Sequence, residues 1–460
     1  MLKAKLFSMV LIITTGFMYA QRIIDPQLVK PIQQAIIHNY DLQNKSLEID
    51  KNKFLMDEIN GKLKPNINAI GVGGYLYTNG SIDLPTKTID ILNLNLFEGS
   101  KNFNAHTGFA SVGITATQVI FSGLQIPNAK KALEEKNFAN ENLMEAEKQN
   151  IIKDVLITFD QLMLLDKVDE LISNSAKRLE KEHLKVQKAI QNGLAIPYDR
   201  EKIKLAMLEL EAKKVEIKGT QKLLYDKLQV QTHLNKNELE QIKYDLDAIN
   251  LLVDEFSIAN KRELKALQHA TKAYQFLYEK EKGAHLPQVF AFAGANATTL
   301  FGGQFKLKDI AYLGDVNLGL NNLAFYPIVT AGIGAKWDIY DGGQHKQKLN
   351  QAKADIQINE NKLKDAEEKL NLLLNKNKIE YETASEKLKV NQQQNTIATN
   401  NLDIASKRFQ EGLIDVTERL AAENDFYKAN LGYYSQIIDQ RKISYEVLHT
   451  AGELYYQILN

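Results

Sequence analysis

The chain carries an internal duplication, so its two halves are expected to fold alike. The segment Ile120–Gln125 reappears as Ile339–Gln344, 219 residues further along. Four more matches keep this offset without a gap: Asn140-Glu141-Asn142 with Asn359-Glu360-Asn361, Lys188 with Lys407, Gly193-Leu194 with Gly412-Leu413, and Arg200 with Arg419. Such a repeat predicts one supersecondary architecture used twice.

Each half contains a long stretch with the pattern of an amphipathic helix. In the first half, Ile152, Val155, Phe159 and Leu162 step by three and four residues, while Lys and Glu fill most of the other positions. No Pro or Gly interrupts residues 128–192. At about 1.5 Å per residue such a helix extends roughly 100 Å, too long for a globular core. We therefore expect it to pack against other long helices in coiled-coil fashion.

Short segments between the helices have the opposite character. Residues 102–129, 287–305 and 316–335 contain no Asp, Glu, Lys or Arg. Within Gly108–Ala116 and Val329–Ile339, apolar residues alternate with small or polar ones. This alternation is typical of a strand between lipid and a water-filled lumen, where about 9–11 tilted residues cross the membrane. The sequence therefore predicts two strand pairs, one in each half.

The first residues predict export. Lys3 and Lys5 precede the apolar run Leu6–Phe17, and Ala20 ends a segment suited to signal peptidase. Beyond it no stretch approaches the roughly 20 apolar residues of a membrane-spanning helix. The chain has no Cys, which excludes disulfides, thiol catalysis and lipidation of an N-terminal Cys.

Four strands per chain predict an oligomer. Unpaired strand edges cannot face hydrocarbon, and about eight strands are the practical minimum for a closed barrel. Two copies would give eight strands, a barrel that side chains fill, whereas three copies give 12 strands and leave a lumen. We expect a homotrimer with a shared 12-stranded barrel in outer-membrane lipid.

The order helix, strand, loop, strand, long helix, glycine turn and returning helix, duplicated behind a signal peptide, resembles the TolC family of outer-membrane efflux proteins. The resemblance covers essentially the whole mature chain. Its carriers are Phe121-x-Gly123, Tyr340-x-Gly342, Gly193-Leu194-Ala195-Ile196 and Gly412-Leu413-Ile414-Asp415-Val416. The corresponding fold class is mainly α with a membrane β-barrel, in which long coiled-coil helices form a periplasmic α-barrel below the strands.

The predicted segments follow this order. They are a signal peptide at 1–20, a periplasmic helix at 21–64, a strand pair at 65–122, a helical arm at 123–253 with its turn near 193, a helix at 254–286, a second strand pair at 287–341, and a second arm at 342–460 with its turn near 412.

The resemblance also implies partners and a location. It implies a passive exit duct for efflux or type I secretion, in the outer membrane of a Gram-negative bacterium and extending into the periplasm. An inner-membrane pump of the RND or ABC type would couple to it through a periplasmic adaptor (membrane fusion) protein. Many members carry a lipidated Cys where this chain has Gln21, so we expect the barrel alone to hold it. The cargo stays open.

Two groups of residues are candidates for function. Gly193-Leu194 and Gly412-Leu413 end the long helices at turns that need a left-handed residue, and the resemblance implies that these turns meet the adaptor. Asp403, Lys407 and Arg408 lie one to two helical turns from Gly412 and are candidates for a gate of charged side chains. A solvated helix face is the alternative interpretation of those three.

Other functions find little support. The eight His are scattered without a metal-ligand spacing, and Asp341-Gly342-Gly343 lacks the Lys-Ser/Thr ending of a phosphate loop. We therefore expect no enzyme activity, no cofactor and no metal. With 57 basic and 57 acidic residues and no basic face, the chain is not expected to bind nucleic acid. Two alternatives stay open: a coiled-coil surface protein with a small β-barrel anchor, and a periplasmic adaptor.

Overall fold

The computed structural model describes residues 24–83, 85, 87–89, 94–97, 99–310 and 313–455. The predicted signal peptide and Gln21 lie outside the described residues. The chain divides into two compact units, which we call the helical unit (Met1–Glu48, Asn140–Leu267 and Lys362–Asn460) and the strand unit (Ile49–Ala139 and Gln268–Asn361).

The elements follow the predicted order. The helices are α1 Val29–His38, α2 Tyr40–Gly61, α3 Gln125–Gln191, α4 Pro197–Thr232, α5 Lys236–Glu240, α6 Arg262–Gly283, α7 Gln344–Gln410 and α8 Val416–Ala451. Short 3-10 turns cover η1 Pro26–Leu28, η2 Val253–Glu255 and η3 Ile258–Asn260. The strands are β1 Asn66–Asp83, β2 Lys87–Ile89, β3 Leu94–Phe97, β4 Ser100–Phe121, β5 Gln288–Ile310 and β6 Gly314–Lys336.

The duplication is visible in the helix boundaries. Helices α3 and α7 both have 67 residues, and α4 and α8 both have 36. Each member of the second pair begins and ends 219 residues after its counterpart, the offset found in the sequence. The two arms are therefore the same structure, built twice.

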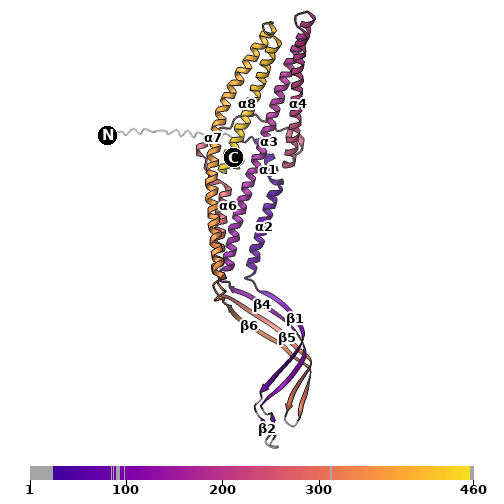
Figure 1. Ribbon diagram of the computed structural model, residues 1–460, viewed down its shortest axis with the longest axis vertical. Helices are drawn as coiled ribbons and strands as arrows, with labels where there is room; N and C mark the ends of the chain where they lie inside the picture. Colours follow the sequence, from indigo (N-terminus) through magenta and orange to yellow (C-terminus); the bar gives the residue numbers. More distant parts are fainter. Residues whose placement is uncertain are drawn as a thin grey trace, which may run out of the picture. The chain divides into compact units, whose positions relative to one another are not determined.

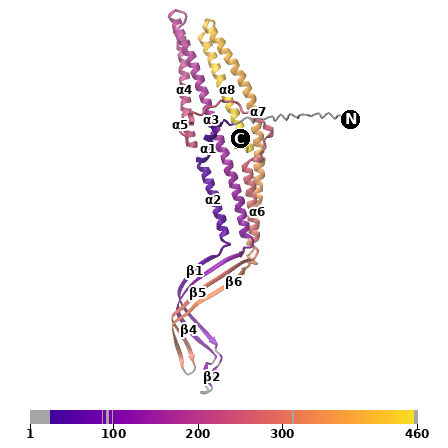
Figure 2. The same cartoon turned by 180° about the vertical axis from the view of Figure 1, so that it is seen from behind.

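In the helical unit the long helices form two hairpins that pack on each other. Both views show α4 beside α3 and α8 beside α7 (Figures 1 and 2). Between the hairpins, Ile172 and Leu179 of α3 are buried in one cluster with Ile203 of α4 and with Val416 and Tyr427 of α8. The narrow apolar seam predicted for α3 is thus the contact between long helices.

A second core of the helical unit surrounds the middle of α3. Phe159, Leu228 and Tyr445 are buried there together with residues of α1. The irregular segment after α5 also joins this core. It is held by Gln440, whose side chain accepts from Ile249 N and donates to Ile249 O, and by Tyr381, whose hydroxyl accepts from Leu251 N at 2.8 Å.

The strand unit contains one antiparallel sheet in the order β1-β4-β5-β6, with β2 and β3 forming a separate small hairpin (Figure 1). The four main strands have 18, 22, 23 and 23 residues. They are about twice the length needed to cross a membrane. Among the described residues, β1 and β6 each pair on one side only, so the sheet has two open edges.

Two helical boundaries differ from the sequence prediction. The first predicted helix is interrupted at Asn39, whose extended backbone (φ −72°, ψ 117°) separates α1 from α2, and its side chain accepts from Leu42 N. The predicted helix from Asp254 begins only at Arg262, because two 3-10 turns precede it. Neither break contains Pro or Gly, so no strong local signal marks it.

Candidate functional site

The two faces of the sheet have different compositions. The register places aliphatic residues and glycine together on one face: Ile67, Ala69, Gly71, Val112, Ile114, Ala116, Ala293, Ala295, Val329, Ala331, Ile333 and Ala335. The other face carries small and polar residues: Asn68, Ser111, Gly113, Thr115, Gly294, Asn296, Thr298, Thr330, Gly332 and Gly334. The alternation seen in the sequence therefore runs across all four strands.

Aromatic rings on the polar face lie flat over glycines of the neighbouring strand. Phe290 lies over Gly334 and Phe292 over Gly332, and a Cβ added to either glycine would approach the ring to 2.5 Å or 2.9 Å. Phe109 covers Gly74 in the same way. These rings cover the glycine backbone instead of standing off the sheet, which leaves the space above the polar face clear.

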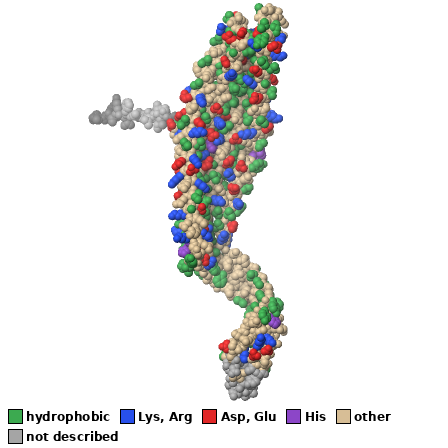
Figure 3. All heavy atoms as spheres, viewed as in Figure 1, with side chains coloured by type: hydrophobic (Ala, Val, Ile, Leu, Met, Phe, Trp, Pro, Cys, Tyr) green, Lys and Arg blue, Asp and Glu red, His purple; other side chains and the backbone are tan. Residues whose placement is uncertain are grey.

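Charged side chains avoid the strands except at one end. Figure 3 shows Lys, Arg, Asp and Glu spread over the helices and nearly absent from the strands until the end of the sheet near its loops. At that end Lys306 pairs with Asp315 at 2.9 Å, and Lys101 donates to the carbonyl oxygen of Asp309.

The strand-to-helix turns are built alike in both copies. Ser122 Oγ accepts from Ile126 N, and the repeat-equivalent Asp341 accepts from Gly343 N and His345 N. Both side chains cap the start of a long helix by satisfying amides that have no partner in the helix.

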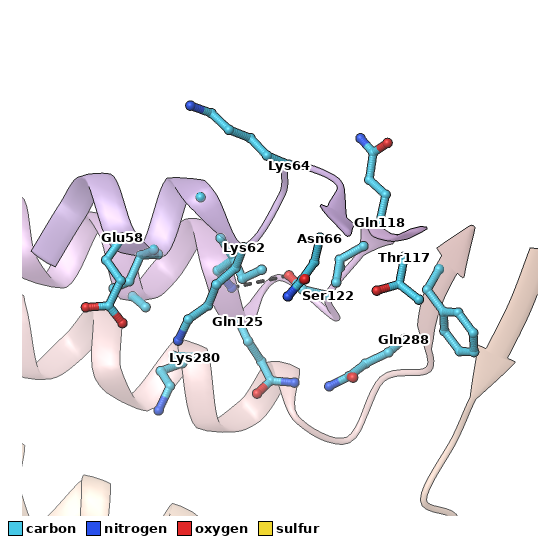
Figure 4. A pocket seen from close by; sticks show the side chains of 16 residues that line it. Glu58, Lys62, Lys64, Asn66, Thr117, Gln118, Ser122, Gln125, Lys280 and Gln288 are labelled. Atoms are coloured by element: carbon cyan, nitrogen blue, oxygen red, sulfur yellow. Dashed lines mark hydrogen bonds between the residues drawn. The ribbon is translucent and has the colours of Figure 1, made fainter. Parts of the chain in front are cut away.

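A cavity of about 790 Å³ lies in the strand unit beside the first of these turns. Lys62, Lys64 and Lys280 line it with Glu58 and several amide side chains, and Lys64 points away from the other labelled residues (Figure 4). This set holds neither a pair of carboxylates nor a nucleophile beside a base, so its chemistry is that of a wet, mainly cationic surface.

The two turns at Gly193 and Gly412 share one geometry. Both glycines have φ of 71°. Leu194 N donates to Ala189 O at 2.8 Å, and Leu413 N donates to Arg408 O at 2.9 Å, which is the six-to-one hydrogen bond of a Schellman ending. The leucine side chains are 81% and 67% exposed. The predicted tip residues therefore form two alike turns, each presenting one leucine to the surroundings.

The predicted gate residues lie on the last turns of α7. Lys407 and Asp403 pair with each other at 2.6 Å, four residues apart, and their side chains are 72% and 62% exposed. Arg408 lines an open groove between α7 and α8 that also contains Glu418. An exposed pair of this kind is worth only about 0.3–0.5 kcal/mol.

A buried ion cluster near the same end was not predicted. Arg419 of α8 contacts Glu182 of α3 at 2.7 Å and Glu423 at 2.9 Å, and Arg178 contacts Glu423 at 2.6 Å. The Arg419 side chain is 1% exposed. Since Arg178 and Glu182 belong to one hairpin and Arg419 and Glu423 to the other, the cluster ties the two hairpins together.

The pKa values in this cluster are shifted in opposite directions. Burial raises the pKa of Glu182 above its ordinary value, against the charge of Arg419. Burial would also raise the pKa of Glu423, but its hydrogen bond and charge interaction with Arg178 outweigh this and hold its pKa below the ordinary value. A sequence signal existed only in part: Arg419 and Glu423 have the i, i+4 spacing of a helical pair, while their partners lie about 240 residues away.

The described residues offer neither a helix long and apolar enough to span a membrane nor a group of His, Asp and Glu arranged to hold a metal ion. What the chain presents instead is a long two-faced sheet with open edges and two long helical hairpins. This combination defines the class of outer-membrane channels.

Solved structures of that class match the chain over nearly its whole length. The outer membrane protein VceC from Vibrio cholerae matches with a TM-score of 0.69 at 14% identity, covering 94% of this chain and 97% of its own. The CmeC outer membrane channel of Campylobacter jejuni gives 0.68 at 13%, covering 93% and 86%. The open state of the MtrE outer membrane channel of Neisseria gonorrhoeae gives 0.67 at 15%, covering 93% and 90%.

Residues 256–448 match the model of the family described as outer membrane efflux protein. Together with the shared fold, this match confirms the resemblance to the TolC family and the outer-membrane location that it implied. No curated protein sequence matches the chain significantly. The family is a channel type and not an enzyme type.

Proposed function

We propose that three copies of this chain close into one channel that serves as the passive exit duct of a tripartite efflux or type I secretion system. A periplasmic adaptor protein would connect it to an inner-membrane pump of the RND or ABC type. The pump would supply the energy, because the described residues offer no phosphate-binding loop or metal cluster to this chain.

The open edges of the sheet carry this proposal. Strands β1 and β6 have 18 and 23 residues, and each pairs on one side only among the described residues. In hydrocarbon every unpaired backbone group costs several kcal/mol, so edges of this length need a partner there. Three four-stranded sheets give 12 strands, enough for a lumen.

The two faces of the sheet fit opposite sides of such a barrel. The aliphatic face would contact lipid, and the face with Ser111, Thr115, Asn296 and Thr298 would line the water-filled lumen. Segments 65–122 and 287–341 would then be the outer-membrane parts, and the two helical arms would extend into the periplasm.

The duct function is tested by deletion and by conductance. Cells lacking the chain should accumulate a fluorescent efflux dye, and re-expression should restore its export. The purified protein in a planar bilayer should give single-channel currents. Unchanged dye export together with the absence of currents would leave the protein as a surface structure anchored by its strands.

The exposed leucines support a docking role for the helical turns. A photo-crosslinking residue at Leu194 or Leu413 should form an adduct with a co-expressed adaptor, because each side chain projects freely from a rigid turn. The same residue at Val230, which is 77% exposed on α4, serves as the control. Adducts at Val230 with none at the two leucines would remove the docking assignment.

Asp403, Lys407 and Arg408 are retained as candidate gate residues. In the assembled duct their charges would lie near the narrow end of the helical barrel. If so, Asp403→Ala should change single-channel conductance, whereas Asp365→Ala, which breaks a similar exposed pair with Lys369 far from the turn, should not. Equal conductance in the two variants would exclude Asp403 from the gate.

A further inference from the structure

We propose that neighbouring copies join by repeating, between chains, the strand pairing that β4 and β5 make within one chain, so that β6 of one copy pairs with β1 of the next with Thr330 opposite Leu76. This inference rests on the proposed assembly and adds to it the residues that meet at each seam.

The internal repeat fixes the register of equivalent strands. In the first copy Asn66 lies opposite Thr117, and in the second Gln288 lies opposite Lys336. Gln288 is 222 residues beyond Asn66 and Lys336 is 219 beyond Thr117, and these two offsets relate every pair from there through Ile70–Gly113 and Phe292–Gly332. The two strand pairs are therefore the same unit in the same register.

The join between these units within the chain can be transferred to the join between chains. Within the chain, Ser111 of β4 lies opposite Thr298 of β5, and their hydroxyls are 2.9 Å apart. The same offsets convert Ser111 into Thr330 and Thr298 into Leu76. Applied to residues 328–336 and 70–78, they place Ala335 opposite Gly71.

The transferred register keeps each face of the sheet continuous. Odd-numbered residues of β6 from Val329 to Ala335 and odd-numbered residues of β1 from Ile67 to Gly73 lie on the aliphatic face. In this register odd residues meet odd residues, so Ile333 lies beside Gly73. A slip by one residue would place the aliphatic residues of one chain beside the polar face of the next, which a barrel in lipid does not tolerate.

Two glycines outside the sheet mark the same seam independently. Within the chain, Gly283 at the end of α6 packs on Gly123, and a Cβ added to Gly283 would lie 2.0 Å from the carbonyl oxygen of Gly123. The repeat equivalents of these residues are Gly61 and Gly342. Neither meets any atom within 4 Å in the single chain.

Nothing within one chain explains a glycine at position 61. Gly61 ends α2 without a left-handed φ, and the space around its Cβ position is open. A neighbouring copy explains it, because Gly342 of that copy would approach Gly61 as Gly123 approaches Gly283. The sheet edges and the glycine pair thus indicate the same occupant, a second copy of this chain.

Cysteine crosslinking tests the register cleanly, because the chain contains no Cys. The full-length double variant Thr330→Cys/Leu76→Cys, treated in outer-membrane vesicles with a short bifunctional thiol reagent, should convert most of the protein into covalent dimers and closed trimers. Thr330→Cys/Tyr77→Cys, which places the second thiol on the opposite face, should stay monomeric. Ser111→Cys/Thr298→Cys should lose its free thiols without gaining mass, which confirms that equivalent positions react.

The outcomes separate this inference from the proposed function. Crosslinking of Thr330/Tyr77 in place of Thr330/Leu76, or of neither pair in a protein whose native mass is that of three chains, overturns the register and leaves the duct intact. A native mass of one chain overturns both.

A second variant covers the case in which cysteines disturb the sheet. Gly61→Ala normally strengthens a helix. At this seam it should instead lower the temperature at which the trimer dissociates, because its Cβ would meet Gly342 of the next copy. A dissociation temperature equal to or above that of the wild type would contradict the seam.

Discussion

At the residue scale, the duplication turns one copy into a control for the other. Leu124 has a left-handed backbone with φ of 65°, and the equivalent position in the second copy is Gly343 with φ of 84°. A bulky residue in this conformation is strained, whereas glycine is not. The first turn therefore holds a strain that the second one lacks.

Leu124→Gly should raise the free energy of unfolding by about 1 kcal/mol, since the left-handed conformation costs an L-residue roughly 1–2 kcal/mol and the half-exposed Leu124 side chain gives little of this back. Gly343→Leu should lower it by a similar amount. Thermal unfolding followed by circular dichroism measures both, and a loss of stability in Leu124→Gly would show that the leucine side chain matters more than its backbone.

A second residue-scale effect concerns pH. Burial, with added repulsion from Lys261 and Lys153, lowers the pKa of His449 from 6.5 to about 3. Below pH 6.5 the unfolded chain binds a proton that the folded chain refuses, so the stabilisation is complete above pH 6.5 and is lost as the pH falls toward 3.

The slope of this loss is about 1.4 kcal/mol per pH unit for one proton. His449→Gln should therefore flatten the pH dependence of the unfolding free energy between pH 6 and pH 4. Equal slopes in wild type and variant would mean that His449 titrates normally in the folded protein.

At the element scale, the ion cluster between α3 and α8 fixes how the two hairpins pack. Removing Arg419 leaves Glu182 and Glu423 buried with less compensating charge. Breaking a buried pair by removing one partner costs about 3–5 kcal/mol. Its repeat equivalent, Arg200, pairs only with the exposed Glu201 beside it.

Arg419→Met should accordingly lower the unfolding free energy by about 3 kcal/mol, while Arg200→Met should change it by less than about 0.5 kcal/mol. Urea unfolding of the two variants under the same conditions provides the comparison. Similar small effects at both positions would mean that the cluster contributes little to hairpin packing.

The same scale shows what the sequence could predict. The repeat, the uncharged segments and the glycine turns were sufficient for the order of helices and strands and for the alike turns at Gly193 and Gly412. Periodicity identified the seam of α3, because Ile152, Phe159 and Leu162 are buried as a stripe.

What the sequence could not show depends on contacts between distant segments. The break at Asn39 and the irregular segment held by Gln440 and Tyr381 are tertiary features without turn residues of their own. The ion cluster escaped prediction because Arg178 and Glu423 lie 245 residues apart. Proximity in sequence had favoured Asp403 and Lys407, which form an exposed local pair.

At the scale of the whole molecule, the chain has the secondary structure of a channel wall without the closure. Its sheet has two open edges among the described residues, and its aliphatic face is exposed, with Ile333 at 73% and Val329 at 70%. Apolar surface and free backbone groups of this kind are stable only when lipid covers the first and further strands pair with the second.

Native mass spectrometry of the detergent-solubilised protein tests the central claim most directly. A single species with the mass of three mature chains is predicted, because 12 strands close the barrel and leave a lumen. A species with the mass of one or two chains, persisting at all protein concentrations, would contradict a shared barrel and the exit-duct function with it.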